Sequence, residues 1–234
     1  FYTNVQMVGD NFLVRGYEDG KHFAAREKFY PTLFVDSKRK TKYKTLDGLP
    51  VEPIEPGTVR DCREFIKKYN DVENFNVYGN ERFIYQYISD KYPETELKFD
   101  IEQIKLTTID IEVKSEYGFP DVESCAEEIL LITLQDYTTK QIRTWGLGAF
   151  NNKQENVIYK SFRTEYELLT DFINWWMIED NTPEVITGWN SKLYDIPYLC
   201  RRIDRILGEK LKKRMSPWGL VTEEETFIAG RKHI

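Results

Sequence analysis

Histidine and cysteine are scarce in this sequence of 234 residues. The two histidines, His22 and His233, lie near opposite ends of the chain, which argues against a His-rich zinc site and against a Ser-His-Asp hydrolase. The three cysteines, Cys62, Cys125 and Cys200, are far apart and form no C-x-x-C pair. Their odd number and wide spacing indicate free thiols in a reducing compartment. The chemistry of the chain is therefore expected from other side chains.

Long apolar runs and an excess of positive charge are absent as well. No run approaches the roughly 18 apolar residues of a membrane-spanning helix, and no signal-peptide pattern is present, so we expect a soluble protein without a membrane partner. The chain carries 33 Lys and Arg against 39 Asp and Glu, a net charge of −6. This balance excludes a protein whose whole surface neutralises nucleic-acid phosphates, but it allows a nucleic-acid enzyme with an acidic, metal-dependent site.

The apolar content predicts a folded chain, with 41% hydrophobic and 15% aromatic residues. Residues 1–102 contain short strands, turns and a helix capped by Thr58, which predicts a small α+β N-terminal domain. Residues 47–57, rich in Pro and Gly, predict a loop. Residues 38–44, the basic stretch, carry five positive charges in seven positions. Such a run suits phosphate binding, although a solvated loop is the commoner reason for it.

Residues 103–234 predict an RNase H-like domain of the α/β class, with a mixed sheet and helices. Strands are expected over residues 106–113, 128–135, 141–147, 156–162 and 184–187. The capping box Thr164–Glu167 predicts one helix, and a second helix ends at Gly208. In an RNase H-like arrangement the strand over residues 106–113 lies centrally, beside the strand over residues 184–187.

Two carboxylates lie close together on the strand expected over residues 106–113. Side chains alternate along a strand, so Ile109 and Ile111 share one face and Asp110 and Glu112 share the other. Two like charges this close are unfavourable unless a cation lies between them, and Mg²⁺ commonly uses one or two carboxylates together with substrate phosphates. An isolated Asp-x-Glu is more often a pair of solvated acids, so its interpretation depends on the rest of the chain.

A third carboxylate, Asp195, follows the strand over residues 184–187. In the expected topology it lies beside Asp110 and Glu112. Three such acids can hold two divalent ions roughly 4 Å apart, one activating a water for attack on phosphorus and the other neutralising the leaving oxygen. Carboxylates favour Mg²⁺ or Mn²⁺. The sequence thus predicts phosphodiester hydrolysis, with these three residues as the catalytic and metal-binding groups.

Two segments resemble the first and second exonuclease motifs of the family B DNA polymerases of T4-like bacteriophages. Residues Leu97–Val113, with their Ile-Asp-Ile-Glu sequence, resemble the first motif and its lead-in, and residues Thr187–Tyr198 resemble the second. The second match is highly specific, because Trp-Asn, Tyr-Asp and Ile-Pro-Tyr occur together at fixed spacing. The resemblance extends more weakly over residues 1–95. It implies a DNA-directed DNA polymerase with 3′–5′ exonuclease activity.

Three residues gain roles only through this resemblance. Asn190 and Tyr194 match positions that contact the 3′ end of single-stranded DNA, and Phe119 matches a phenylalanine that stacks on a base. Considered without the resemblance, Phe119 and Tyr194 are equally candidates for core packing, and Asn190 for a cap at the end of a strand.

The resemblance also implies a biological setting. Proofreading removes a mispaired 3′ nucleotide as the 5′-monophosphate, so the implied partners are a single-stranded 3′ end, a primer-template and the remainder of the polymerase chain. A sliding clamp and RNA are implied through the full-length protein, in the cytoplasm of the infected bacterial host. Residues 215–234 resemble the start of the hairpin that separates primer from template, with a turn at residues 229–232.

One part of the family pattern is missing. A third motif, Tyr-x-x-x-Asp, supplies a fourth carboxylate in these polymerases, and no such pattern follows Asp195. We therefore expect an N-terminal fragment, truncated within the exonuclease domain, that is weak or inactive as a nuclease alone. Two alternatives stay open. One is a non-catalytic nucleic-acid-binding module, which the basic stretch favours, and the other is a free-standing exonuclease of the RNase D type, which requires a fourth carboxylate within the chain.

Overall fold

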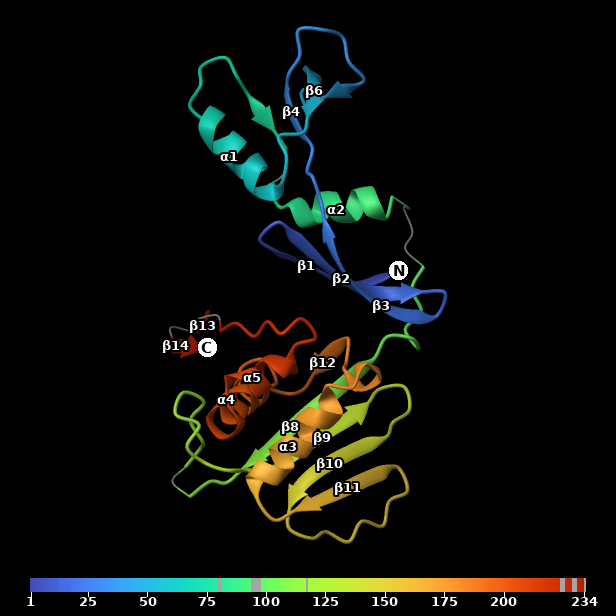
Figure 1. Cartoon of the computed structure of the whole chain (residues 1–234), viewed down its shortest axis with the longest axis vertical. Helices are drawn as coiled ribbons and strands as arrows, with labels where there is room; N and C mark the ends of the chain where they lie inside the picture. Colours follow the sequence, from blue (N-terminus) through green and yellow to red (C-terminus); the bar gives the residue numbers. More distant parts are fainter. Residues whose placement is uncertain (80, 94–97, 117, 224–225, 229–230, 234) are drawn as a thin grey trace. The chain divides into compact units, whose positions relative to one another are not determined.

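A computed structural model describes residues 1–79, 81–93, 98–116, 118–223, 226–228 and 231–233. The chain divides into two compact units, Phe1–Asp100 and Ile101–Ile234 (Figure 1). Within the described residues, no helix is long and apolar enough to cross a lipid bilayer.

The described residues of the first unit form two antiparallel sheets and two helices. One sheet consists of β1 (Tyr2–Val8), β2 (Asn11–Glu18) and β3 (Lys21–Lys28). The other has the order β5-β6-β4-β7, from β5 (Tyr43–Lys44), β6 (Pro50–Ile54), β4 (Leu33–Asp36) and β7 (Val77–Tyr78). The helices are α1 (Val59–Tyr69) and α2 (Phe83–Lys91). Both contribute to one buried cluster, which includes Phe12, Leu33, Cys62, Phe83 and Tyr87.

The capping prediction for α1 is confirmed. The Thr58 side chain accepts a hydrogen bond from the backbone N–H of Asp61, and the Asp61 carboxylate accepts one from the backbone N–H of Thr58. This reciprocal arrangement satisfies two backbone donors that a helix start otherwise leaves without partners.

The prediction of a loop over residues 47–57 is wrong in its middle. Residues 50–54 form β6, which pairs with β4 from Val51 to Ile54 and with β5 at Pro50 and Val51. Pro53 therefore lies where β6 is an edge strand, and Pro50 is the first residue of the strand. Proline is tolerated at both kinds of position, because its missing N–H interrupts no ladder there.

The second unit is a mixed α/β structure, as predicted. Its five-stranded sheet has the order β11-β10-β9-β8-β12, from β8 (Leu106–Val113), β9 (Ile129–Asp136), β10 (Ile142–Leu147), β11 (Val157–Phe162) and β12 (Val185–Thr187). Pairs β8–β9 and β9–β10 are antiparallel, whereas β10–β11 and β8–β12 are parallel. Strand β8 thus lies beside β12, as expected.

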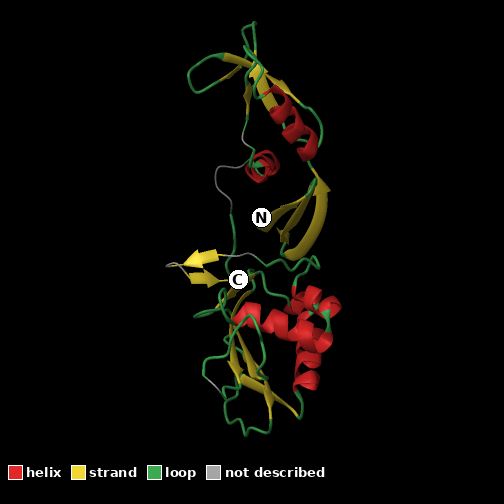
Figure 2. Ribbon diagram, turned by 90° about the vertical axis from the view of Figure 1, so that its left-hand side faces the viewer, coloured by secondary structure: helices red, strands yellow, loops and turns green. Residues whose placement is uncertain are grey.

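Helices cover one side of this sheet (Figure 2). They are α3 (Glu165–Trp176), α4 (Asp195–Leu207) and the short α5 (Glu209–Lys212), with 3₁₀ turns at Glu179–Asn181 and Lys213–Met215. The capping box at Thr164 and Glu167 is confirmed at the start of α3. Apolar residues of α3, α4 and the strands form one core, which includes Ile109, Ile132, Trp145, Phe172, Trp176 and Ile203. Burial of these large side chains supplies the main driving force for folding of the unit.

Near the C-terminus, β13 (Thr226–Ile228) and β14 (Arg231–His233) form an antiparallel pair. The turn expected at residues 229–232 includes residues 229 and 230, which lie outside the described residues.

Candidate active site

The Asp-x-Glu pair lies on β8, where the predicted alternation is observed. Ile109 and Ile111 are buried in the core, and Asp110 and Glu112 are exposed. The regular ladder with β9 shifts register between Glu112 and Val113. Such irregularities bend a strand and end its regular pairing. The two carboxylates therefore occupy the end of the regular part of β8, which lies next to the edge strand β12 and not at the centre of the sheet as predicted.

The β12–α4 junction brings the third carboxylate to this strand. Asp195 is the first residue of α4, and its Oδ1 accepts a hydrogen bond from the backbone N–H of Ile111 at 3.3 Å. Its side chain is buried, with 5% exposure. Because Ile111 lies between Asp110 and Glu112 in the sequence, Asp195 contacts β8 at the middle of the carboxylate pair.

Electrostatic repulsion couples the three acids. Burial raises the pKa of Asp195, and the negative charges of Asp110 and Glu112 raise it further. The hydrogen bond from Ile111 acts in the opposite direction, because it stabilises the charged carboxylate. A cation bound among these groups would relieve the repulsion.

The donor set suits a hard divalent cation, but its side chains do not converge on one point. Carboxylate oxygens are ligands that Mg²⁺ and Mn²⁺ favour. In the described part of the chain, however, no group of three or more His, Cys, Asp or Glu residues is arranged to hold a metal ion. Asp195 is bound to the strand backbone, whereas Asp110 and Glu112 are exposed. Sharing an ion would require these exposed side chains to rotate.

Two of the expected DNA-contacting residues form an aromatic pair. The ring centroids of Phe119 and Tyr194 are 4.8 Å apart, and Tyr194 is 5.5 Å from Tyr198. Phe119 is 79% exposed, so core packing does not explain it. Tyr194 is half-buried, and burial together with the charge of Asp195 raises its pKa to about 12. The pair thus joins an exposed ring to the residue directly before Asp195.

Asn190 is exposed in the same junction. Its backbone carbonyl accepts hydrogen bonds from the N–H groups of Leu193 and Tyr194, which forms the turn that leads into α4. The neighbouring Trp189 is fully exposed and was not predicted as a site residue. The available signal was its place in the Trp-Asn pair of the second exonuclease-like segment.

Gly188 joins β12 to this turn at a point where the backbone has no room for a side chain. An added Cβ would lie 2.6 Å from the carbonyl oxygen of Ile109 and 3.0 Å from Cβ of Ser191. We expect Gly188→Ala to lower the free energy of unfolding by about 1–3 kcal/mol, because the backbone must shift to admit the methyl group.

Urea denaturation measures this effect, and Thr187→Ala is the matched control. Thr187 is the preceding residue and its side chain is exposed, so its replacement is expected to cost about 0.5 kcal/mol or less. Equal losses for the two variants would contradict the close approach at Gly188.

Comparison with known proteins shows the family to which the chain belongs. Residues 58–232, more than half of the chain, match the family described as DNA polymerase family B, exonuclease domain. The DNA-directed DNA polymerases of Enterobacteria phage T4 and Escherichia phage RB69 are each 31% identical, over 94% and 93% of this chain respectively. The DNA polymerase catalytic subunit of human herpesvirus 6A is 35% identical over 42% of the chain.

The chain spans 27% of the length of the two phage polymerases and 10% of the herpesvirus subunit. The match over residues 58–232 includes β8, β12 and α4, which carry the three carboxylates. The chain belongs to the exonuclease-domain family of the family B DNA polymerases, and it is similar to the exonuclease region of the T4-like phage enzymes.

Proposed function

We propose that this chain carries the 3′–5′ exonuclease site of a phage replicative DNA polymerase and hydrolyses single-stranded DNA ends to nucleoside 5′-monophosphates. The hydrogen bond from Ile111 to Asp195 is the observation that carries the proposal. It joins the two exonuclease-like motifs, which are far apart in the sequence, at one strand. The second unit as a whole is then an RNase H-like exonuclease domain, preceded by a polymerase-associated N-terminal domain.

Each site residue has a distinct task in this proposal. Asp110, Glu112 and Asp195 would hold two Mg²⁺ or Mn²⁺ ions, and these ions would supply an activated water and neutralise charge on the phosphate. Phe119 and Tyr194 bind the terminal base by stacking, which tolerates any sequence. Asn190 binds the 3′ end by hydrogen bonding. Without a Tyr-x-x-x-Asp motif after Asp195, we expect this chain to be a weak nuclease by itself.

The proposal extends to the setting of the site. The substrate is the frayed 3′ end of a primer-template, presented by the remainder of the polymerase chain in the cytoplasm of an infected bacterium. A sliding clamp and RNA are partners of the full-length protein. The strands β13 and β14 belong to the hairpin that separates primer from template.

A single-turnover assay tests the activity. The chain, in excess over 5′-labelled single-stranded DNA with Mn²⁺, is expected to shorten the DNA slowly from its 3′ end, and Asp110→Ala is expected to remove this activity. Fluorescence anisotropy with the same DNA adds a second readout. We expect Mn²⁺ to raise the affinity of the parent chain for a 3′ end, and to leave that of Asp110→Ala unchanged.

Shortening that persists in Asp110→Ala, or that begins at the 5′ end, would assign the activity to another site or a contaminant. If the parent chain neither shortens the DNA nor responds to Mn²⁺, the nuclease proposal is wrong for this chain.

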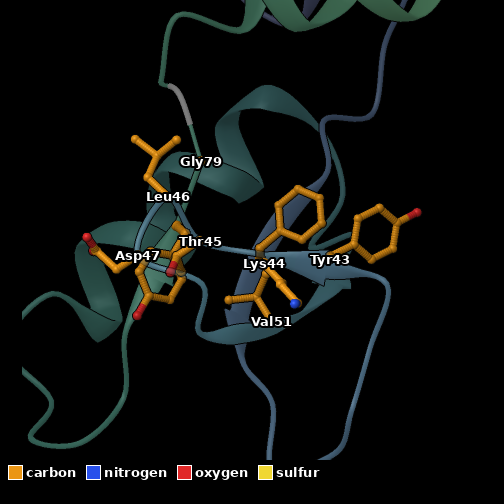
Figure 3. Close-up of a pocket in the computed structure, with 9 residues that line it drawn as sticks. Tyr43, Lys44, Thr45, Leu46, Asp47, Val51 and Gly79 are labelled. Carbon is orange, nitrogen blue, oxygen red and sulfur yellow. The ribbon is translucent and has the colours of Figure 1, made fainter.

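A second candidate function, nucleic-acid binding without catalysis, rests on a pocket in the first unit (Figure 3). The cavity measures about 450 Å³, and its lining includes Phe34, Tyr43, Lys44 and Tyr78. The Nζ atom of Lys42 lies 4.8 Å from the centre of the Tyr43 ring. Aromatic rings beside the basic stretch suit stacking on bases together with phosphate binding. DNA binding that survives unchanged in Asp110→Ala, with no nuclease activity in the parent, would favour this function.

A further inference from the structure

One face of α4 binds the loop that connects β8 to β9. Tyr198, Arg201, Arg202 and Arg205 follow the i, i+3, i+4, i+7 spacing that places side chains on one side of a helix. All four donate hydrogen bonds to backbone carbonyls of residues 122–127. We call these four side chains the α4 clamp.

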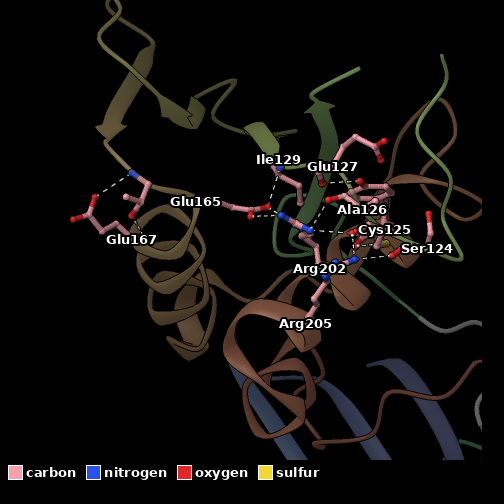
Figure 4. Close-up of polar contacts among 11 residues, drawn as sticks. Ser124, Cys125, Ala126, Glu127, Ile129, Glu165, Glu167, Arg202 and Arg205 are labelled. Atoms are coloured by element: carbon pink, nitrogen blue, oxygen red, sulfur yellow. Dashed lines mark hydrogen bonds and ion pairs between the residues drawn. The ribbon is translucent and has the colours of Figure 1, made fainter. Parts of the chain in front are cut away.

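The contacts of the clamp are short and numerous. Arg202 Nη1 donates to the carbonyls of Cys125 at 2.9 Å and Ala126 at 3.1 Å, and Arg205 Nη1 donates to those of Ser124 at 3.0 Å and Cys125 at 3.2 Å (Figure 4). Arginine presents several donors in a rigid plane, so one side chain can fix two carbonyls at once.

The other two members bind the ends of the same segment. Arg201 Nη1 donates to the carbonyl of Val122 at 2.9 Å, and the Tyr198 hydroxyl donates to that of Glu127 at 2.7 Å. Residues 122–127 belong to no strand or helix. Their carbonyls therefore depend on side-chain donors where a sheet would supply backbone ones.

A buried ion pair anchors the clamp to α3 and β9. Arg202 donates from Nε and Nη2 to the two carboxylate oxygens of Glu165, both at 2.7 Å. The side chains of Arg202 and Glu165 are 8% and 6% exposed. Glu165 Oε1 also accepts from the backbone N–H of Ile129, the first residue of β9, at 2.8 Å. The start of β9, α3 and α4 thus share one polar network.

The clamped loop also carries Phe119. This residue is largely exposed, and in the described part of the chain the ring that pairs with it is that of Tyr194. Packing into a core does not hold Phe119 in place, so its position depends on the backbone of the loop. The helix that clamps this loop begins with Asp195. The same helix therefore sets both the third carboxylate and the loop that carries the exposed ring.

We propose that Arg201, Arg202, Arg205 and Tyr198 are positioning residues for the DNA site. By fixing the loop against α4, they keep Phe119 against Tyr194 and so form a ready-made stacking surface for the terminal base of a single-stranded 3′ end. This inference rests on the proposed exonuclease function. A preformed surface binds DNA more tightly than a loop that must first become ordered. The loop has then already lost its conformational entropy on folding, and binding does not have to offset that loss.

Arg205 offers the sharpest test, because its side chain is exposed and its replacement leaves the buried ion pair intact. The variants are Arg205→Gln, which removes the charge and whose amide donor is two bonds closer to the backbone than Nη1, and Arg205→Lys, which keeps a charged donor. Lys210→Gln is the matched control, since it removes one positive charge from the exposed surface of α5.

Two measurements separate positioning from general stability. Amide hydrogen exchange is followed for a peptide covering residues 118–128, and DNA binding is followed with 2-aminopurine as the 3′-terminal base, in Mn²⁺. For Arg205→Gln we expect about tenfold faster exchange in this peptide, the size of one charge-assisted hydrogen bond. We also expect several-fold weaker binding and less quenching of the 2-aminopurine. Arg205→Lys is expected to recover part of both effects, and Lys210→Gln to behave as the parent.

Each failure has a distinct meaning. If the loop peptide of Arg205→Gln exchanges as slowly as that of Lys210→Gln, the clamp does not hold the loop. If exchange accelerates but binding and quenching equal those of the parent, the positioning role for DNA is overturned. If the parent chain itself binds no 3′ end, the proposed exonuclease function fails, which the parent measurement alone reveals.

Discussion

Replacing Arg202 by Met is expected to lower the free energy of unfolding by about 3–5 kcal/mol, the usual cost of breaking a buried ion pair. The substitution leaves Glu165 buried and charged, with only the Ile129 N–H among its observed partners. Burial alone lowers the pKa of Arg202, but the hydrogen bonds and charge of Glu165 outweigh it and raise the pKa. The guanidinium of the parent is therefore charged at every accessible pH.

The double variant Glu165→Met, Arg202→Met separates charge from packing. Apolar replacement of a whole buried pair is often far less costly than removal of one partner. We expect the double variant to be more stable than Arg202→Met, though below the parent, because the carbonyl of Ala126 loses its donor. Urea denaturation of the full chain measures the free energy of unfolding for the parent, for Arg202→Met and for the double variant.

Lys213→Met is the matched control, because it breaks an exposed i,i+4 ion pair. The pair joins Glu209, on α5, to Lys213, in the turn that follows α5. Such pairs contribute about 0.3–0.5 kcal/mol. A loss for Arg202→Met as small as that of the control would show that the Glu165–Arg202 pair does not stabilise the fold. A double variant less stable than Arg202→Met would show that the hydrogen bond from Ile129 to Glu165 outweighs the cost of burying an unpaired carboxylate.

Local signals explain which parts of the fold the sequence could predict. The caps at Thr58 and Thr164 depend on residues three positions apart, so both helix starts follow from the sequence alone. The alternation on β8 is equally local, and it correctly places Asp110 and Glu112 on the exposed face. These elements lie in segments where propensity and pattern agree.

The missed features depend on contacts between distant segments. Strand β6 contains two prolines, which locally predict a loop. Both are tolerated because β5 pairs with β6 only at Pro50 and Val51, and no local pattern reveals this pairing. The α4 clamp joins residues more than 70 positions apart in the sequence. The three arginines were visible as a helical stripe, but a stripe of positive charge on a helix predicts a solvated face as readily as a set of loop contacts.

In the candidate site, too, some features could be predicted from the sequence and others could not. Topology placed Asp195 beside β8, because a parallel neighbour strand leads directly into α4. The rotamers of Asp110 and Glu112 are not determined by topology, and the described residues contain no converged metal-binding group. Exposed carboxylates repel one another and have several accessible rotamers, so a local pattern does not fix their positions.

Asp195→Asn is expected to separate stability from activity. The amide oxygen of Asn can still accept the hydrogen bond from Ile111, while the substitution removes a buried negative charge next to Asp110 and Glu112. Without metal we expect the free energy of unfolding to equal that of the parent or to exceed it by up to about 1 kcal/mol, within the range of ordinary single substitutions. Under the proposed function, the single-turnover rate of DNA shortening in Mn²⁺ is expected to fall on the order of 100-fold or more. Replacing a residue that only hydrogen-bonds to a metal ligand already costs about 10–100-fold, and Asp195 would be a ligand itself.

Thermal denaturation with and without Mn²⁺ adds a readout that does not depend on catalysis. A ligand that binds only the folded state raises its stability, so Mn²⁺ is expected to raise the Tm of the parent and to have less effect on Asp195→Asn. Asp204→Asn is the control, because Asp204 lies on the same helix but pairs with Lys212 at 2.6 Å. Nuclease activity retained by Asp195→Asn would exclude Asp195 from the reaction. A loss of stability well above that of Asp204→Asn, with an unchanged response to Mn²⁺, would make Asp195 a structural residue whose charge the fold itself requires.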